Sequence, residues 1–311
     1  MPSDDLLSNL RPLVGNELPA GLPNTVAFII GANPSQGARS PKLWNAAYRA
    51  LGIDGAMFPL DVSKENLAAV FRLLEGDQRV VGVAVAAPYK TEFVQLLAGR
   101  LSAAARDCGS INLMSRGANG VSSNPNRHDL TKFFGSNTDG IAAIESLREV
   151  RPDYARMPVL VLGCGGTGRA VIASLLLETK PANLTVAIRS KQHRLWLDSL
   201  GLAACSATLD DVDLTGVRVL INCTTIGWGS DVDTSPMNDV QLASLHPACT
   251  VFDVVYQPDP TLLLQHARAR GLTTLSGSRM NLLQAVIAFT TANRNAHQRD
   301  VAAAMQQATA V

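Results

Sequence analysis

The strongest constraint on the fold is a glycine-rich segment that directly follows a short apolar run. Residues 158–162 (PVLVL) lead into Gly163-Cys-Gly-Gly-Thr-Gly168, which fits the pattern G-x-G-x-x-G. A strand, this pattern and a helix in succession are typical of dinucleotide-binding α/β domains, where the N-terminus of the helix faces a pyrophosphate. Glycine-rich turns also occur without ligands, but a strand and a helix on either side favour a dinucleotide site here.

Each part of this glycine loop has an expected task. Gly163 allows the tight turn after the strand, Gly165 lets the backbone approach a pyrophosphate, and Gly168 permits close packing of the helix on the strand. Gly166 and Thr167 complete the loop. These residues are the predicted contacts to the phosphates of a dinucleotide.

The strand expected over 184–188 ends in a basic segment, Arg189-Ser190-Lys-Gln-His-Arg194. An Asp or Glu at that point would hydrogen-bond the free 2′-hydroxyl of an adenosine ribose, and none is present. An arginine can instead bind a 2′-phosphate through two hydrogen bonds. The segment therefore favours NADP over NAD, with Arg189, Ser190 and Arg194 as candidate contacts. The alternative is an ordinary solvent-exposed basic loop.

Short apolar runs alternate with segments of helical periodicity along most of the chain. Strands are expected over 26–30, 80–87, 158–162, 184–188, 217–221 and 250–254, and helices over 42–51, from 63 and from 169. A polar stretch, 115–132, interrupts the alternation and predicts a surface hairpin or loop. The alternation predicts mostly parallel sheets covered by helices. A length of 311 residues suits two such α/β units in series.

Composition and charge exclude several classes of partner. Lys plus Arg number 27 and Asp plus Glu 26, and the net charge of +1 gives no general attraction for nucleic acid. The start MPSDD has no signal-peptide character, and the most apolar run, 79–88, is far shorter than the ~20 residues of a membrane span. The five cysteines are scattered and the histidines lie far apart, so we expect a reduced cytoplasmic chain without a metal site.

Polar residues beside Gly or Pro stand where several expected strands end, and strand ends line the ligand crevice of open parallel sheets. In order, the segments are ARSP (38–41), AVAAPYK (84–90), GSINL (109–113), NTDG (137–140), GCGGTGR (163–169), IRS (188–190), NCTTIGW (222–228), DVVYQPDPT (253–261) and MNLLQ (280–284). Singly, each is more often a turn than a site. In order and spacing, over about residues 26–289, they resemble the shikimate dehydrogenase family (shikimate/quinate 5-dehydrogenase-like).

The resemblance implies an NADP-dependent oxidoreductase that transfers hydride reversibly at a ring secondary alcohol of shikimate, quinate or a related cyclic hydroxy acid, as in aromatic amino acid biosynthesis. Lys90 and Asp139 match the catalytic Lys and Asp of the family. Lys90 then takes the hydroxyl proton, and such acid–base help is typically worth ~10²–10⁴-fold in rate. Asp139, at the start of a helix where the dipole favours an anion, orients Lys90. A surface ion pair is the alternative interpretation of these two residues.

The resemblance also implies the binding residues. On the substrate side, the matches at the ring hydroxyls and near the carboxylate end are Asn112, Gln284, Ser40 and Tyr256. On the cofactor side, the matches are Asn222, Thr224 and Met280, the last of them beside the nicotinamide. For Asn112 and Tyr256, a purely local role in a loop is the alternative.

The order of the motifs implies how the chain divides into domains. Residues 1–140 form an α/β substrate-binding domain, which a C-terminal helix over 278–311 completes. Residues 141–277 form a Rossmann-type, doubly wound NADP-binding domain, with a cleft between the two. The implied partner is a small cyclic hydroxy acid, and a monomer or homodimer is expected.

The chain departs from the family pattern on the substrate side. The first Ser of the family's S-x-S-P and the Asn and Thr of its N-V-T are replaced by Ala38, Ala84 and Ala86, and its G-M near the nicotinamide is Gly227-Trp228. A lost hydrogen bond to a substrate costs ~0.5–1.5 kcal/mol, or ~1.5–3 kcal/mol where it meets a carboxylate. Unless a neighbour substitutes (Ser35, Gln36 or Arg39), we expect weak shikimate binding and a shift toward quinate or another polyhydroxylated cyclic acid.

Two other functions stay open. One is a metabolite sensor with this fold and no activity, which the presence of both Lys90 and Asp139 disfavours. The other is a different lysine-dependent dehydrogenase, for example one acting on a folate. The D-x-x-Y-x-P and N-T-D-G strings disfavour this second alternative.

Overall fold

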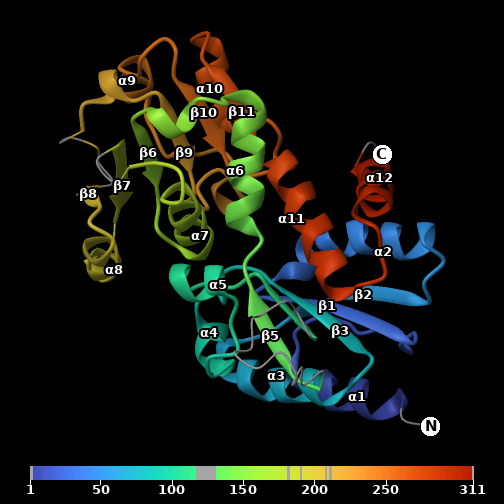
Figure 1. The fold of residues 1–311 in the computed structure, drawn as a ribbon. Helices are drawn as coiled ribbons and strands as arrows, with labels where there is room; N and C mark the ends of the chain where they lie inside the picture. Colours follow the sequence, from blue (N-terminus) through green and yellow to red (C-terminus); the bar gives the residue numbers. More distant parts are fainter. Residues whose placement is uncertain are drawn as a thin grey trace. The chain divides into compact units, whose positions relative to one another are not determined.

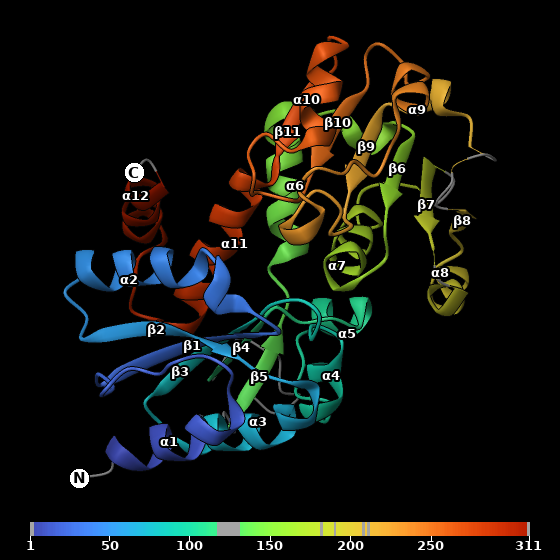
Figure 2. The same ribbon diagram turned by 180° about the vertical axis from the view of Figure 1, so that it is seen from behind.

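The computed structural model describes residues 3–116, 131–180, 183–189, 191–206, 209 and 212–309. The chain folds into two compact units, one made of Met1–Thr138 and Leu282–Val311 and the other of Asp139–Asn281. It passes into the second unit between Thr138 and Asp139 and returns within a helix, between Asn281 and Leu282. Figures 1 and 2 show the ribbon from opposite sides.

The first unit contains a five-stranded sheet in the order β2-β1-β3-β4-β5. Its strands are β1 (Thr25–Gly31), β2 (Gly55–Asp61), β3 (Val80–Val85), β4 (Leu113–Arg116) and β5 (Phe133–Ser136). The first three run parallel, whereas β4 and β5 are antiparallel to their neighbours, so this sheet is mixed. Most of the predicted surface hairpin or loop, residues 117–130, lies outside the described residues.

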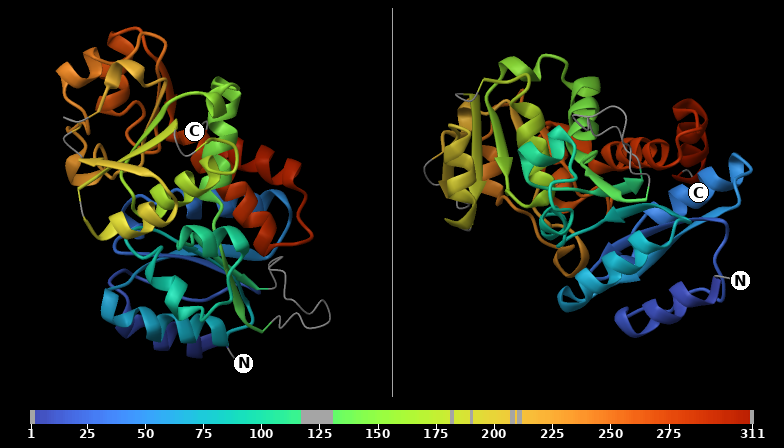
Figure 3. Two further views of the ribbon diagram at one scale, coloured as in Figure 1. Left: turned by 60° about the vertical axis from the view of Figure 1, so that its left-hand side comes forward. Right: turned by 60° about the horizontal axis from the view of Figure 1, so that its bottom comes forward.

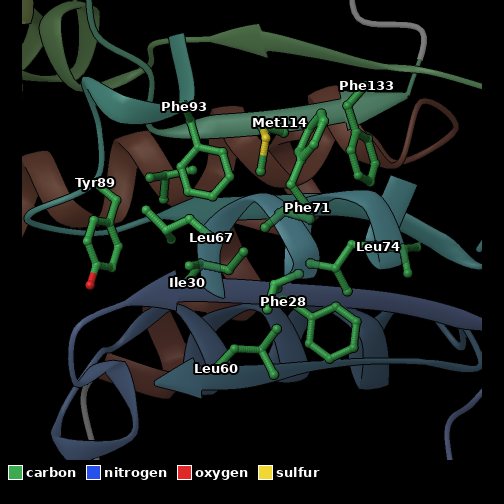
Figure 4. Packing of buried hydrophobic residues seen from close by; sticks show 14 of the residues in the cluster. Phe28, Ile30, Leu60, Leu67, Phe71, Leu74, Tyr89, Phe93, Met114 and Phe133 are labelled. Atoms are coloured by element: carbon green, nitrogen blue, oxygen red, sulfur yellow. The ribbon is translucent and has the colours of Figure 1, made fainter. Parts of the chain in front are cut away.

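The helices of the first unit cover both faces of its sheet. They are α1 (Ser3–Leu10), α2 (Ser40–Ala50), α3 (Leu67–Gly76), α4 (Glu92–Leu96), α5 (Ala103–Cys108), the end of α11 (Gly277–Ala292) and α12 (Gln298–Thr309). Along β1, Phe28 and Ile30 pack with α1 and α3, and Figure 4 shows them on the side of α3 that carries Leu67 and Leu74. Ala27 and Ile29 pack on the opposite face with α2, α11 and α12. Because side chains alternate along a strand, this wholly apolar run needs helices on both sides.

The second unit contains a six-stranded sheet in the order β11-β10-β9-β6-β7-β8, with all paired strands parallel. Its strands are β6 (Val159–Leu162), β7 (Leu184–Ile188), β8 (Ala203–Ser206), β9 (Val219–Asn222), β10 (Thr250–Asp253) and β11 (Thr273–Ser276). Figure 3 shows them from two further directions. Counted from β6, this is the strand order of the doubly wound dinucleotide-binding fold. The predicted α/β fold with a Rossmann-type half is thereby confirmed.

The helices of the second unit are α6 (Asp139–Val150), α7 (Gly166–Leu175), α8 (Arg194–Ser199), α9 (Asp239–Ala243), α10 (Leu262–Ala269) and the start of α11. Apolar side chains of α9 and α10 pack with one face of the sheet, which includes Leu160, Leu220 and Val251. The helix α6 lies against α7. Helices therefore serve here, as in the first unit, to cover strands that are apolar throughout.

Among the described residues, the strands that the sequence pattern does not predict are β2, β4, β5, β8 and β11, and all of them except β4 lie at an edge of a sheet. Pro59 stands in the middle of β2, paired with Ile29. A proline is tolerated at an edge because its missing N–H need not bond a neighbouring strand. Asn16 covers this outer edge: its Nδ2 donates to the Pro59 carbonyl oxygen at 3.1 Å, and its Oδ1 accepts from the Asp61 N–H at 2.7 Å.

Several predicted helix boundaries differ from the structure. The helix predicted over 42–51 is α2, Ser40–Ala50, and the helix predicted from 63 opens with a 3-10 turn, Lys64–Asn66, before α3 begins at Leu67. The helix α7 begins at Gly166 and not at 169, because the last glycines of the loop already form its first turn. The single C-terminal helix expected over 278–311 is two helices, α11 and α12. At the break, the Asn293 side chain donates to the carbonyl oxygen of Phe289 at 3.0 Å, which is a side-chain to backbone bond of the kind that competes with helix continuation.

Phe289 anchors α11 in the first unit, and its removal tests that anchor. Phe289 has no exposed surface, and its ring lies 5.1 Å from the ring of Trp44 and 4.9 Å from that of Tyr48. We expect Phe289→Ala to lower the free energy of unfolding by about 3–5 kcal/mol, because the lost contacts leave a cavity. Urea denaturation followed by circular dichroism measures this. The control is the exposed Lys42→Ala in α2, expected within about 0.5 kcal/mol of wild type. Equal stability of the two variants would contradict the anchor.

Candidate functional site

The glycine loop connects β6 to α7 through positions where little space is left for a side chain. Gly163 has a φ of +91°, and a Cβ there would lie 2.9 Å from Cγ2 of Thr224. A Cβ on Gly168 would lie 2.4 Å from the carbonyl oxygen of Gly163. On the Cβ side of Gly165 there is open space. The loop therefore packs tightly on neighbouring segments of the chain at Gly163 and Gly168, whereas at Gly165 the space beside the backbone is open.

The N-terminus of α7 suits an anion. Gly165 is its N-cap residue and brings no side chain to cap the helix, and the first turn starts with Gly166 and Thr167. A helix N-terminus carries a partial positive charge from its N–H groups, and phosphates bind at such ends. The predicted contacts to a pyrophosphate thus lie together in one loop of the second unit.

The predicted basic segment follows β7. Arg189 is exposed directly after the strand, whereas Ser190 lies outside the described residues. Arg194 begins α8 and pairs with Asp198, with its Nε 3.1 Å from Oδ1. Since a carboxylate already balances the charge of Arg194, Arg189 is the stronger candidate for a phosphate.

Arg169 is a further basic residue near this segment, and the sequence pattern does not single it out. Its guanidinium carbon lies 4.8 Å from the centre of the Trp196 ring. Burial and the charge of Arg169 both lower the pKa of His193. Arg169 directly follows the last glycine of the loop, and Trp196 lies in α8. The Arg of the segment GCGGTGR was the available signal, but its stacking partner lies 27 residues away and has no local pattern.

Asp139 lies beside the glycine loop. It is the first residue of α6, only 4% exposed, and Thr167 Oγ1 donates to its Oδ2 at 3.3 Å. The next residue, Gly140, makes this possible, because a Cβ there would lie 2.4 Å from the carbonyl oxygen of Ala170 in α7. The glycine of the NTDG segment thus lets α6 approach α7 closely enough to hold a carboxylate against the loop.

In the first unit, three predicted positions lie around the ends of β3 and β4. The side chain of Asn112 accepts from the Thr138 N–H at 2.9 Å and donates to Thr138 Oγ1 at 2.9 Å. Its Nδ2 also lies 3.5 Å from Oε1 of Gln284 in α11. Lys90 is half-buried after β3, and its carbonyl oxygen accepts from the N–H of Ile111 at 2.8 Å. Lys90, Asn112 and Gln284 therefore belong to one region of this unit.

Ser40 is the first residue of α2 and is 9% exposed. The N-cap residue before it, Arg39, is half-buried and makes no capping bond through its side chain. The three alanines that replace polar family residues, Ala38, Ala84 and Ala86, all pack against the apolar cluster that contains Trp44 and Phe289. Their side chains extend the core of the first unit and offer no polar group.

Ser35 is one of the residues that the sequence offers as a substitute for the missing hydroxyl. In the structure it serves a neighbouring strand instead. Its N–H donates to Oδ1 of Asp61 at 2.9 Å, and its hydroxyl donates to Oδ2 of the same carboxylate. Both oxygens of Asp61 thus hold the loop after β1 in place.

A buried polar network occupies the ends of β9 and β10. Asn222 Oδ1 accepts from the N–H and the Oγ1 of Thr224, at 3.0 and 2.7 Å, and its Nδ2 donates to Oδ1 of Asp253 at 2.9 Å. Burial raises the pKa of Asp253 to about 6, although hydrogen bonds from Thr261, Val255 and Asn222 act in the opposite direction. Asp253 is not among the predicted site residues, and its place at the head of the DVVYQPDPT segment was the signal for it.

Two other predicted residues of the second unit, Tyr256 and Met280, follow β10 in the chain. Tyr256 is half-buried three residues after β10, and Met280 is 5% exposed in α11.

Burial raises the pKa of the Cys164 thiol in the glycine loop to about 11, so the thiol stays protonated near neutral pH. Within the described ranges there is no group of three His, Cys, Asp or Glu side chains arranged to hold a metal ion. None of the helices described is long and apolar enough to cross a membrane.

Known proteins are similar to this chain in sequence and in fold. The family model of the shikimate dehydrogenase substrate binding domain matches residues 29–114. A shikimate dehydrogenase (NADP(+)) of Rhodospirillum rubrum is 37% identical over 269 residues, which are 83% of this chain and 88% of its own. One of Paramagnetospirillum magneticum is 33% identical over 262 residues, with 82% and 88% covered. The crystal structure of shikimate dehydrogenase from Aquifex aeolicus has a TM-score of 0.76 at 25% identity, covering 92% of this chain and 97% of that one.

These similarities extend over most of the chain and agree with the strand order of the second unit. The chain is therefore a member of the shikimate dehydrogenase family and an oxidoreductase of that type, which confirms the assignment that its motifs predict.

Proposed function

We propose that this chain catalyses the reversible NADP-dependent oxidation of a ring secondary alcohol in shikimate, quinate or a close cyclic hydroxy acid. The observation that supports this most is the approach of α6 to α7 at Gly140, which holds the buried carboxylate of Asp139 beside the glycine loop. The relatives from Rhodospirillum rubrum and Paramagnetospirillum magneticum carry the name shikimate dehydrogenase (NADP(+)).

The second unit fits NADP. The open side of Gly165 and the N-terminus of α7, which no N-cap side chain closes, suit the pyrophosphate. Arg189, exposed at the end of β7, suits the 2′-phosphate, since a guanidinium binds phosphate oxygens through paired hydrogen bonds. When bound, NADP supplies the acceptor for the hydride.

A side chain of the protein carries the proton in this reaction. In the oxidation, the substrate loses a proton from its hydroxyl oxygen and a hydride from the adjoining carbon, and becomes a ketone. We assign the proton to Nζ of Lys90, which accepts it as an amine and returns it as an ammonium in the reverse reaction. Asp139 orients that group and accepts a hydrogen bond from a ring hydroxyl. Asp139 is the first residue of α6, where the positive end of the helix dipole attracts a carboxylate.

Substrate binding uses the polar groups of the first unit and Tyr256. The amides of Asn112 and Gln284, with Nδ2 and Oε1 3.5 Å apart, can exchange hydrogen bonds with ring hydroxyls. Ser40 and the N-terminus of α2 suit the carboxylate, since an anion is favoured at a helix start. Tyr256 is proposed to contact the same end of the substrate.

The selectivity is proposed to differ from that of a typical shikimate dehydrogenase. Ala38, Ala84 and Ala86 present methyl groups where the family pattern has polar side chains, and Ser35 is bound to Asp61. Shikimate thus loses polar contacts, whereas a differently substituted ring such as quinate is less affected. A panel of cyclic hydroxy acids assayed with NADP and NAD tests the proposed function as a whole.

Replacing Lys90 tests the assignment of the proton. We expect Lys90→Ala to lower kcat about 10²–10⁴-fold, because the hydroxyl proton loses its acceptor. Formation of reduced nicotinamide, followed by absorbance, measures kcat, and calorimetry measures NADP binding, which stays unchanged. Lys132→Ala is the matched control, because the Lys132 side chain is 50% exposed and its ion pair with Glu75 at 3.4 Å contributes little. Full activity of Lys90→Ala would refute the role.

Replacing Arg189 tests the choice of cofactor. We expect Arg189→Ala to reduce the ratio of kcat/KM with NADP to that with NAD about 10-fold or more, because a charged hydrogen bond to phosphate contributes about 1.5–3 kcal/mol. Steady-state assays with both cofactors give the ratio. Arg194→Ala changes it less, because Arg194 is already paired with Asp198. If the ratio of kcat/KM with NADP to that with NAD is unchanged in Arg189→Ala, Arg189 does not bind the 2′-phosphate.

Restoring the polar groups tests the proposed selectivity. We expect the double variant Ala84→Asn, Ala86→Thr to lower the KM for shikimate about 5–10-fold, since each neutral hydrogen bond contributes ~0.5–1.5 kcal/mol. The KM for quinate changes less. The measurement is a comparison of both substrates in wild type and variant. A wild type that turns over shikimate selectively, as well as or better than quinate, contradicts the shifted selectivity.

A further inference from the structure

Asp253 is a fully buried carboxylate at the junction of three segments. It has no exposed surface and ends β10. Its Oδ1 accepts from Nδ2 of Asn222 at 2.9 Å and from the N–H of Val255 at 3.0 Å, and its Oδ2 accepts from Oγ1 of Thr261 at 2.7 Å. The donors belong to the end of β9, the loop after β10 and the N-cap of α10.

The hydrogen bonds of Asp253 lead to the glycine loop in two steps. Asn222, held by Asp253, accepts from both the N–H and the Oγ1 of Thr224. Thr224 in turn packs on Gly163, where a Cβ would come within 2.9 Å of its Cγ2. The position of the loop after β9 relative to the glycine loop thus depends on a carboxylate in the next strand.

The strand order assigns this region to one half of a dinucleotide. The order reverses between β6 and β9, and a dinucleotide binds across that point, with one nucleotide toward each side of the sheet. The adenosine ribose is read at the end of β7. The loops after β9 and β10 lie on the other side of the switch point and therefore face the nicotinamide half.

We propose that Asp253 is a positioning residue for the nicotinamide half of the cofactor site, acting through Asn222 and Thr224. This inference rests on the proposed function, because it assumes that the second unit binds NADP. Asp253 also bonds the N–H of Val255, next to Tyr256, so the same carboxylate fixes the segment that carries a proposed substrate contact.

The chemistry of the site identifies the variants to use. Asp253→Ala leaves three buried donors without their acceptor. Asp253→Asn keeps an oxygen for Asn222 and Val255, and its amide can donate to Thr261 if that hydroxyl reverses. Thr261→Val removes one donor with little change in shape, and Thr261→Ser keeps it. Asp213→Ala is a matched control, because Asp213 bonds the exposed Thr215 at 3.0 Å in the same unit.

The experiment compares two ligands on the full chain by calorimetry: NADP, and 2′,5′-ADP, which lacks the nicotinamide half. We expect Asp253→Ala to lower kcat about 10-fold or more and to weaken NADP binding at least about 3-fold, because the nicotinamide is misplaced. Binding of 2′,5′-ADP stays within about 2-fold, because the adenosine side is untouched. Asp253→Asn and Thr261→Ser keep most of the wild-type kcat and NADP affinity. Thr261→Val lowers both, but less than Asp253→Ala does, and Asp213→Ala changes neither.

Each other outcome overturns the inference. Equal weakening of both ligands shows that Asp253 only stabilises the unit as a whole. Unchanged kcat and binding show that the loop after β9 does not need it. Should Asp253→Ala fail to fold, Thr261→Val and Thr261→Ser take its place. The inference then requires that Thr261→Val weaken the binding of NADP more than that of 2′,5′-ADP, and that Thr261→Ser weaken neither. A wild type that binds neither ligand refutes the proposed function itself, and this inference with it.

Discussion

Close approach of one backbone segment to another, at positions without a side chain, holds the glycine loop and its neighbours together in the second unit. Gly168 lets the first turn of α7 meet the carbonyl of Gly163, and Gly163 in turn lies against Thr224. Gly140 does the same between α6 and α7 and sets Asp139 beside the loop. Such contacts need no side chain to form and cannot tolerate one. The polar network of Asn222 and Asp253 then secures the loop that packs on Gly163.

The sequence predicts the interior of each sheet better than its edges. Central strands such as β1, β6 and β9 are apolar on both faces, so they form continuous runs that are easily recognised. Edge strands lack one neighbour and tolerate residues such as Pro59, and the edge strands β2, β5, β8 and β11 are not predicted. The interior strand β4 is not predicted either, because its end overlaps the polar stretch 115–132. In the site, the glycine loop and the order of the motifs were sufficient to predict the family and the type of oxidoreductase. The stacking of Arg169 on Trp196 and the central place of Asp253 depend on tertiary contacts and could not be predicted from local sequence.

The site proposed for the substrate keeps the two catalytic residues of the family pattern but lacks three of its polar side chains. Lys90 and Asp139 are present, and Asn112 is held in place by Thr138. In the first unit, Ala38, Ala84 and Ala86 are half-buried and pack against its apolar core. Burying a polar side chain there costs free energy unless it finds a hydrogen-bond partner, whereas an alanine has no such requirement. The replacements therefore favour packing within the unit and remove groups that a polyhydroxylated ligand could use.

The covered edge of β2 also affects how separate molecules meet. An uncovered edge strand offers a row of N–H and C=O groups to which a strand of another chain can add, and this is a common route to aggregation. Along β2, Pro59 has no N–H to offer, and the Asn16 side chain occupies both the Pro59 oxygen and the Asp61 N–H. Pro59, which makes β2 hard to predict from the sequence, thus also helps to prevent a strand of a neighbouring molecule from pairing with this sheet.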